Sequence, residues 1–197
     1  MNESLEPLGP IVGLQVQTDH LKLGQPPARR YDPTPVTAVA GLDIDRDGVT
    51  GILDDGTVLL DVHHRHHPRS RHRGDNGVSL GFSGHYRAIG ERFARELPVG
   101  AAGENLIIDD DRVHDPARFY RGVVIVGAAG RVRLTAVIAA PPCVEFTRYC
   151  LGLSDGDDRG SVTAGLEFLG GGMRGFYAEL EGETARVRPG DMAYAVT

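Results

Sequence analysis

Cys143 is the residue whose neighbours most clearly favour chemistry. It follows two prolines and precedes Val144 and Glu145. Proline suits the first position of a helix, because its missing N–H would have no partner there. A helix beginning at Pro142 would therefore hold Cys143 in its first turn, where unpaired N–H groups stabilise a thiolate. We predict a reactive cysteine that binds a metal, carries sulfur or attacks an electrophile; the alternative is a buried apolar thiol.

The second cysteine, Cys150, lies among Phe146, Tyr149 and Leu151. On one helix the spacing would separate the two cysteines by roughly 10 Å along the axis. That is too far for a disulfide, and only in an irregular loop could the pair meet. We therefore predict two free thiols in a reducing cytoplasm, with Cys150 in the core.

Residues 63–73, called the His/Arg segment below, contain five histidines, four arginines and no acidic residue. This positive charge in an acidic chain suits an anion, and the planar arginine fork binds two phosphate oxygens at once. If the preceding strand continues, His64 and His66 share one face, while His63 and His67 share the other. Either pair could then ligate zinc or nickel. The alternative is a solvated loop whose histidines pack locally.

Two further patterns are weaker. Residues 43–48 resemble the start of an EF-hand calcium loop, but Asp54 replaces the final glutamate and a strand-like run follows, so we expect a polar turn. Residues 100–106 are glycine-rich without a P-loop ending, and there Glu104 or Asn105 could point at a ligand. A hydrolase in which a histidine activates Cys143 is a further alternative.

The elements that position these residues are expected to be short strands and a few helices. The clearest helix covers residues 83–97, with Ser83 as its cap and an apolar stripe on one face. Further helices are expected over residues 143–153 and 162–169, and an irregular loop over 22–35. Expected strands cover residues 11–17, 36–44, 57–63, 77–82, 104–108, 122–126, 131–138, 174–180, 184–188 and 192–196. This pattern favours a mainly β, barrel-like fold with a few short helices.

The composition limits the classes of protein. A chain of 197 residues suits a single domain, in which residues 1–10 read as a tail. The net charge of −6 argues against a general nucleic-acid binder. No apolar run is long enough to span a membrane, and no signal peptide is evident, so we expect a cytoplasmic protein.

Several motifs, taken in order over about residues 36–194, resemble the MOSC domain family, named after the C-terminal domain of molybdenum cofactor sulfurases. In this chain they read Asp47-Gly48-Val49-Thr50-Gly51, His72-Arg73-Gly74-Asp75-Asn76-Gly77-Val78, Ser83-Gly84-His85-Tyr86, Gly103-Glu104-Asn105-Leu106, Pro142-Cys143, Arg174-Gly175-Phe176-Tyr177 and Val187-Arg188-Pro189-Gly190-Asp191. Arg73 stands where the family has glycine.

The resemblance implies a β-barrel of the pyruvate-kinase-barrel type and a functional Cys143. In the family this cysteine is thought to carry sulfur as a persulfide or to ligate the molybdenum of a pterin cofactor. The resemblance also implies that the His/Arg segment suits the cofactor's phosphate and that Glu104 and Asn105 orient the pterin. The implied cofactor-binding residues are Arg71, His72, Arg73, Glu104, Asn105 and Arg174.

We therefore expect a protein that binds the molybdenum cofactor (molybdopterin) or carries sulfur to it through Cys143. It would act either as a carrier or as an oxidoreductase that reduces small N-hydroxylated compounds. The chain lacks the cysteines of an iron–sulfur cluster and has no room for a desulfurase domain, so a cysteine desulfurase or an electron-donor protein would be its partner. The alternative is a metal- or anion-binding protein without catalysis, with His64 and His66 as metal ligands.

Overall fold

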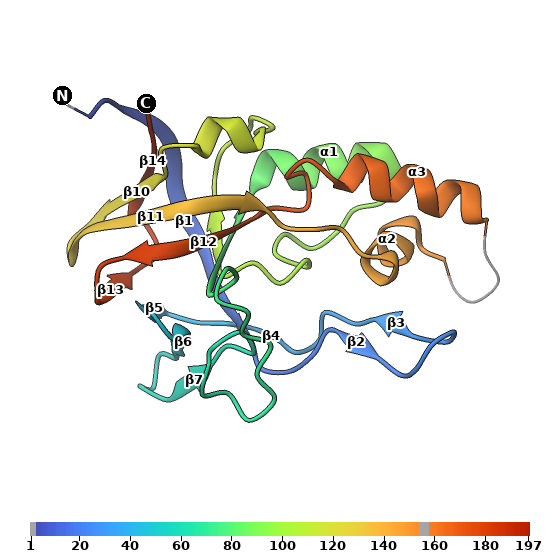
Figure 1. The fold of residues 1–197 in the computed structure, drawn as a ribbon, viewed down its shortest axis with the longest axis horizontal. Helices are drawn as coiled ribbons and strands as arrows, with labels where there is room; N and C mark the ends of the chain where they lie inside the picture. Colours follow the sequence, from blue (N-terminus) through green and yellow to red (C-terminus); the bar gives the residue numbers. More distant parts are fainter. Residues whose placement is uncertain (1–2, 154–157) are drawn as a thin grey trace.

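The computed structural model describes residues 3–153 and 158–197 and consists mainly of β-strands (Figure 1). Seven strands close into a barrel in the order β14-β10-β11-β12-β8-β9-β1, because β1 pairs with β14 as well as with β9. The neighbours are antiparallel except for the parallel pair β8 and β9. The barrel strands are β1 (Leu5–Gln17), β8 (Val78–Phe82), β9 (Leu106–Ile108), β10 (Val123–Gly127), β11 (Gly130–Ala139), β12 (Phe176–Glu181) and β14 (Met192–Val196). The predicted barrel-like fold is confirmed.

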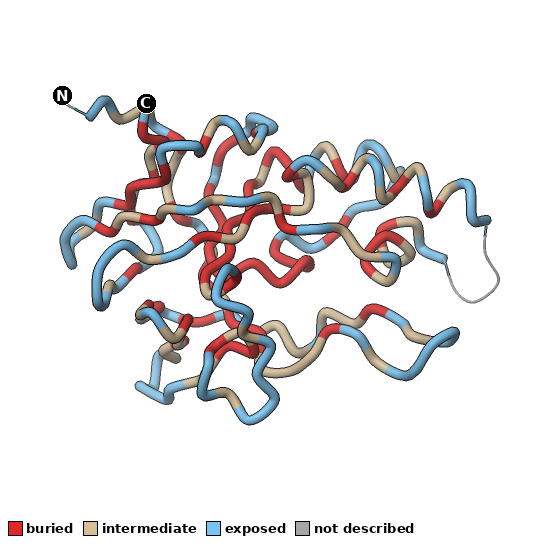
Figure 2. The backbone as a smooth tube through the Cα atoms, in the orientation of Figure 1, coloured by how far each residue is buried: buried red, intermediate tan, exposed pale blue. Residues whose placement is uncertain are grey.

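The barrel interior is filled by aliphatic side chains and a group of phenylalanine rings. Phe82 stacks on Phe119 with ring centroids 5.6 Å apart, and Phe176 meets Phe119 edge-on at 4.9 Å. Both are geometries that aromatic pairs prefer. Figure 2 shows that the buried residues concentrate along the barrel strands. This sealed interior supplies the rigid scaffold on which the surrounding loops are placed.

The first strand corrects the prediction of an N-terminal tail. β1 begins at Leu5, which pairs with Val196 of β14, and the N–H of Thr197 donates to the carbonyl of Ser4. Both chain ends therefore lie side by side at one end of the barrel (Figure 1). The tail prediction was wrong because Pro7, Gly9 and Pro10 read as strand breakers, whereas here they lie at a register shift of β1.

A smaller sheet packs against the barrel in the order β13-β5-β6-β7. Its strands are β13 (Thr184–Val187), β5 (Gly41–Asp45), β6 (Gly48–Ile52) and β7 (Val58–Leu60), and the short β4 (Val36–Ala38) extends the barrel sheet beyond β1. One expected strand over residues 36–44 is thus two. Between β5 and β6, Asp45 Oδ1 accepts the N–H groups of Asp47 and Gly48 at 2.7 and 3.1 Å, which confirms a polar turn.

A two-stranded hairpin and three α-helices lie to one side of the barrel (Figure 1). The hairpin, β2 (Lys22–Leu23) and β3 (Arg30–Tyr31), occupies the expected loop of residues 22–35. The helices are α1 (Ser83–Phe93), α2 (Val144–Leu151) and α3 (Arg159–Leu169), and a 3₁₀ turn, η1, covers Pro116–Phe119. No helix in the described part of the chain is long and apolar enough to cross a bilayer.

The helix boundaries differ from those expected. Ser83 is not the cap of α1: Phe82 occupies that position, and the Ser83 hydroxyl donates to Asp109 Oδ1 at 2.8 Å. The helix stops earlier than expected, where Ala94 adopts a left-handed conformation with φ 50°. α3 begins earlier than expected because Asp158 caps it by accepting from the N–H of Gly160.

Candidate functional site

A cleft of about 930 Å³ opens beside the barrel. Its walls come from the end of β1, the β2–β3 hairpin, the His/Arg segment, the connection between β11 and α2, and the start of β12. The charged side chains that line it are Asp19, Lys22, Arg29, Arg69, Arg71, Arg73 and Arg174. Cations therefore predominate over the single carboxylate, so the cleft attracts an anion although the chain is acidic overall.

Cys143 lies in this cleft, just before α2. The prediction that Pro142 begins the helix is wrong: α2 begins at Val144, and Cys143 is its N-cap residue with φ −136° and ψ 153°. Extended backbone is typical of this position, and its carbonyl accepts the N–H of Thr147 at 3.0 Å. The half-buried Cys143 thus immediately precedes the first turn, whose N–H groups have no partner within the helix. In the described part of the chain, no histidine hydrogen-bonds to Cys143, so the nucleophile–base pair of a hydrolase is not formed.

Arg174 is a cation of the cleft lining whose guanidinium is held in place by the protein. Its guanidinium donates to the carbonyls of Pro141 and Ala102, each at 3.3 Å, and lies over the Phe146 ring at 5.6 Å. Burial alone would lower the pKa of Arg174, but the neighbouring ionisable groups, including Tyr177 and Cys143, raise it above its usual value. Its buried Nε has no hydrogen-bond partner in the described residues, so a donor is available beside Cys143.

The β2–β3 hairpin is fastened to α2 across the cleft from the barrel. Glu145 pairs with Lys22 at 3.3 Å and with Arg29 at 3.7 Å. Burial would raise the pKa of Glu145, but its backbone hydrogen bond and these two cations lower it. Tyr31 packs edge-on against Phe146 with ring centroids 5.0 Å apart. These contacts fix one wall of the cleft beside Cys143.

The His/Arg segment is a series of turns, and the prediction that the strand continues into it was wrong because β7 ends at Leu60. Three of its arginines have a carboxylate partner: Arg65 pairs with Asp47, Arg69 with Asp19 and Arg73 with Asp75. Arg71 has none among the described residues, and its Nε contacts only the His20 ring at 3.4 Å. Arg71 is therefore the arginine of this segment that is most free to bind an anion.

His64 and His66 lie outside the cleft lining. Their ring centroids are 5.6 Å apart, and His64 Nδ1 accepts the N–H of His66 at 3.1 Å. Burial lowers the pKa of His64. Across the described ranges, no three His, Cys, Asp or Glu side chains are grouped so that they could hold a metal ion, and the structure gives the zinc or nickel alternative no support.

Glu104 and Asn105 lie beneath the cleft and are almost fully buried. Both carboxylate oxygens of Glu104 accept the Tyr86 hydroxyl, at 3.0 and 2.8 Å, and burial raises the pKa of Glu104. With Arg174 and Tyr177, Glu104 lines a small pocket of about 10 Å³, which adjoins the cleft because these last two residues line both. That these residues orient a pterin stays a prediction.

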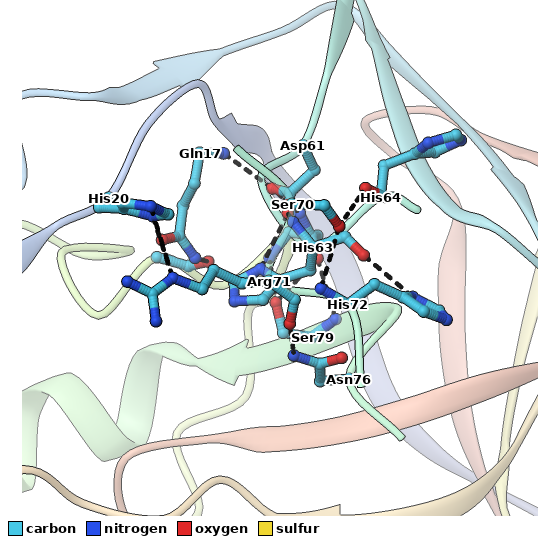
Figure 3. A network of polar contacts seen from close by, with 12 residues as sticks. Gln17, His20, Asp61, His63, His64, Ser70, Arg71, His72, Asn76 and Ser79 are labelled. Atoms are coloured by element: carbon cyan, nitrogen blue, oxygen red, sulfur yellow. Dashed lines mark hydrogen bonds and ion pairs between the residues drawn. The ribbon is translucent and has the colours of Figure 1, made fainter. Parts of the chain in front are cut away.

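Asp61 and His63 form a polar pair that the sequence did not reveal. Asp61 is fully buried, and its Oδ1 is 2.9 Å from Nδ1 of His63, which lines the cleft. Figure 3 shows this pair at the centre of a network that extends to Gln17 and Ser79. An acidic residue two positions before a histidine-rich run was the available signal, but sequence alone could not place it beneath the cleft.

The structure therefore gathers Cys143, Arg71, His72, Arg73 and Arg174 around one cleft, and their roles toward a cofactor stay predictions. Cys150 does not belong to the site. It is fully buried, which confirms the prediction that Cys150 lies in the core, and burial raises the pKa of its thiol to about 12. Both cysteines are free thiols.

Comparisons with known proteins agree with this fold. The family model described as the MOSC domain matches residues 64–194. The crystal structure of the YuaD protein from Bacillus subtilis aligns with a TM-score of 0.61 and 14% identity, over 98% of this chain and 97% of that one. That of a hypothetical protein aligns with a TM-score of 0.53 and 15% identity, over 99% and 70% of the two chains. No curated protein matches the sequence.

Proposed function

This chain belongs to the MOSC domain family, and on that premise we propose that its cleft binds the molybdenum cofactor and that Cys143 supplies the sulfur that serves the metal. The observation that carries the proposal is the placement of a half-buried cysteine and a cationic lining in one cleft. A thiolate is a soft ligand for a transition metal, and arginines bind phosphate oxygens in pairs. The residues present therefore fit a phosphate-bearing, sulfur-ligated group.

The roles of individual residues follow from their surroundings. Cys143 would ligate molybdenum or carry a sulfur atom for it. Arg71, which has no carboxylate partner among the described residues, would bind the phosphate, with His72 and Arg73 beside it on the same wall. Arg174 would hold a second anionic group near Cys143 through its unpartnered Nε.

Two versions of this function share the site. As an oxidoreductase, the protein would reduce small N-hydroxylated compounds, and the bound cofactor would supply the two-electron chemistry. As a sulfur carrier, it would hold a persulfide on Cys143 and pass the outer sulfur on. The partial exposure of Cys143 beside the exposed Val144 favours the carrier version, because a donor protein must reach the thiol.

The test is the molybdenum content of the protein after exposure to a molybdenum cofactor source, measured by elemental mass spectrometry. We expect wild type to retain molybdenum and Cys143→Ser to lose it. Cys150→Ala is the matched control, because it removes the other thiol of the same helix and leaves the cleft unchanged. Equal molybdenum in wild type and Cys143→Ser would contradict the role of Cys143 as anchor.

The same variants separate the two versions. If wild type retains no molybdenum but gains a persulfide on Cys143 from a cysteine desulfurase, the carrier version stands and the oxidoreductase version falls. If neither molybdenum nor sulfur depends on Cys143, the proposed function is wrong.

A further inference from the structure

We propose that His63 is the proton-transfer group of the cleft and that Asp61 and Asn105 are positioning residues that fix its orientation. The inference rests on the carrier version of the proposed function, in which Cys143 holds a persulfide. It deepens that function by assigning the group that ionises the thiol accepting the sulfur.

Asp61 is held rigidly beneath the cleft. Its Oδ2 accepts the N–H of Gln17 at 2.8 Å and the Asn105 Nδ2–H at 3.0 Å. Its Oδ1 accepts the N–H of His63 at 2.8 Å and faces the His63 Nδ1 at 2.9 Å. Two donors therefore meet each oxygen of this buried carboxylate, so its hydrogen-bonding capacity is satisfied within the protein.

Asn105 links this pair to the barrel. Its Oδ1 accepts both the N–H and the hydroxyl of Ser79 in β8, at 3.0 and 2.8 Å, and its Nδ2 donates to Asp61. Each polar atom of the buried Asn105 side chain is thus occupied within the protein. Asn105 therefore acts as a positioning residue: it is bonded to the rigid strand β8 on one side and holds the Asp61 carboxylate on the other.

The carboxylate determines which nitrogen of His63 carries the proton. A carboxylate only accepts hydrogen bonds, so His63 Nδ1 carries the hydrogen and Nε2 is left with a free lone pair. No described residue hydrogen-bonds to Nε2, and His63 lines the cleft with 15% of its side chain exposed. His64 and His67 differ, because their Nδ1 atoms accept backbone N–H groups at 3.1 and 3.0 Å.

Two further residues, His72 and Tyr177, lie beside His63. The carbonyl of His63 is 3.1 Å from His72 Nδ1, and the Tyr177 ring lies beside the imidazole with centroids 6.3 Å apart. Arg73 lies over the Tyr177 ring, with its guanidinium carbon 5.6 Å from the ring centroid. The imidazole is therefore a preorganised base in a cleft that also contains Cys143.

The chemistry balances without an oxidant or reductant. A thiol acceptor gives its proton to His63 Nε2, and its sulfur attacks the outer sulfur of the Cys143 persulfide. The bond between Sγ and the outer sulfur breaks, and its electron pair goes to Sγ. The acceptor leaves as a persulfide, the Cys143 thiolate takes a proton from solvent, and His63 Nε2 releases its own proton to solvent. The net change is the transfer of one sulfur atom from the Cys143 persulfide to the acceptor thiol.

The test compares two sulfur acceptors. Full-length protein is persulfidated on Cys143 with polysulfide, and sulfur loss is followed by mass spectrometry with either 2-mercaptoethanol or thionitrobenzoate as acceptor. The alkyl thiol is mostly protonated at neutral pH and needs a base, whereas the aryl thiol is already ionised. We expect His63→Gln to slow transfer to the alkyl thiol by roughly 10²-fold and to leave transfer to the aryl thiolate nearly unchanged.

His66→Gln is the matched control, because this exposed histidine lies outside the cleft lining, and we expect no change with either acceptor. Equal slowing of both acceptors by His63→Gln would show a merely structural role and overturn the proposal, while sulfur carriage by Cys143 would stand. A Cys143 that takes up no sulfur would overturn both proposals.

A spectroscopic measurement tests the positioning residues directly. In ¹⁵N-histidine NMR spectra of wild type, we expect His63 in the tautomer with hydrogen on Nδ1. Asp61→Asn offers an amide hydrogen to Nδ1, so we expect the hydrogen to move to Nε2 and alkyl-thiol transfer to fall as in His63→Gln. A wild-type His63 with hydrogen on Nε2 would contradict the proposal even if the Asp61 variant failed to fold.

Discussion

Phe176 and Tyr177 are neighbours in β12, but they belong to two different regions of the molecule. Phe176 points into the barrel, where it is 0% exposed and meets the rings of Phe82 and Phe119. Tyr177 points the other way and lines the cleft, beside His63 and Arg73. One strand thus separates an apolar interior from a charged cleft, because side chains alternate between its two faces.

The contrast indicates that stability and ligand binding rest on different forces in this protein. The barrel is held by burial of apolar side chains, a driving force that does not depend on charge. The cleft is shaped by ion pairs such as those of Glu145, which individually contribute little to stability. Variants of the two regions should therefore have separable effects.

The largest effect is expected inside the barrel. Phe176→Ala would leave a cavity among closely packed rings and lower the free energy of unfolding by roughly 3–5 kcal/mol. Tyr177→Ala removes a partly exposed ring from the same strand and should cost less than half as much. Urea unfolding of both variants measures the difference. Equal losses would contradict the separation of the two regions.

The barrel could be predicted from the sequence because its signal is local. Strands such as β10 and β11 show continuous or alternating apolar residues joined by a glycine turn, and neighbouring strands pair with each other. The tail prediction failed in β1, where Pro7 and Pro10 masked a strand that closes the barrel by long-range pairing with β14. Local patterns cannot reveal such a pairing.

The cleft was predictable only in part. The types of Cys143 and of the His/Arg residues indicated an anion and a soft metal, and the order of the motifs indicated the family. The Asp61–His63 pair was not predictable, because Asn105 reaches Asp61 from 44 positions away in the sequence. The Cys143 prediction also misplaced the start of α2, since a proline before a helix can lie outside it.

An intermediate effect on stability is expected at His85, a buried histidine that packs beside the barrel residues Phe82 and Phe176. Burial, with a smaller contribution from His114, lowers the pKa of His85 to about 4. His85 Nε2 accepts the N–H of His114 at 2.8 Å, which only the neutral ring can do. The unfolded chain therefore binds more protons between about pH 4 and pH 6.5, and stability is lost as the pH falls through this window.

We expect wild type to lose about 2 kcal/mol of unfolding free energy between pH 7 and pH 5 through His85. His85→Gln should be less stable at pH 7, but its free energy of unfolding should change less between pH 7 and pH 5, as measured by urea unfolding at several pH values. His66→Gln, at an exposed position, is the control and should keep the wild-type slope. A wild-type slope in His85→Gln would assign the pH dependence to another group, such as His114 with Asp110.

The smallest effect on free energy is expected in the cleft, where it changes binding without changing stability. Arg71 lines the cleft without a carboxylate partner among the described residues, whereas Arg65 lies outside the lining and pairs with Asp47. Arg71→Gln should weaken pyrophosphate binding about tenfold, which corresponds to about 1.4 kcal/mol for a charged hydrogen bond. Arg65→Gln should weaken it less than twofold, although it removes the same charge from the same segment.

Isothermal titration with pyrophosphate at two salt concentrations measures both variants. Because the cleft attracts anions by charge, binding to wild type should weaken as salt rises, and Arg71→Gln should reduce that dependence. If Arg65→Gln and Arg71→Gln weakened binding equally, the net charge of the segment would be responsible rather than a defined site. A larger loss in Arg71→Gln alone would instead place the anion at the one arginine that the protein leaves without a carboxylate partner in the described part of this segment.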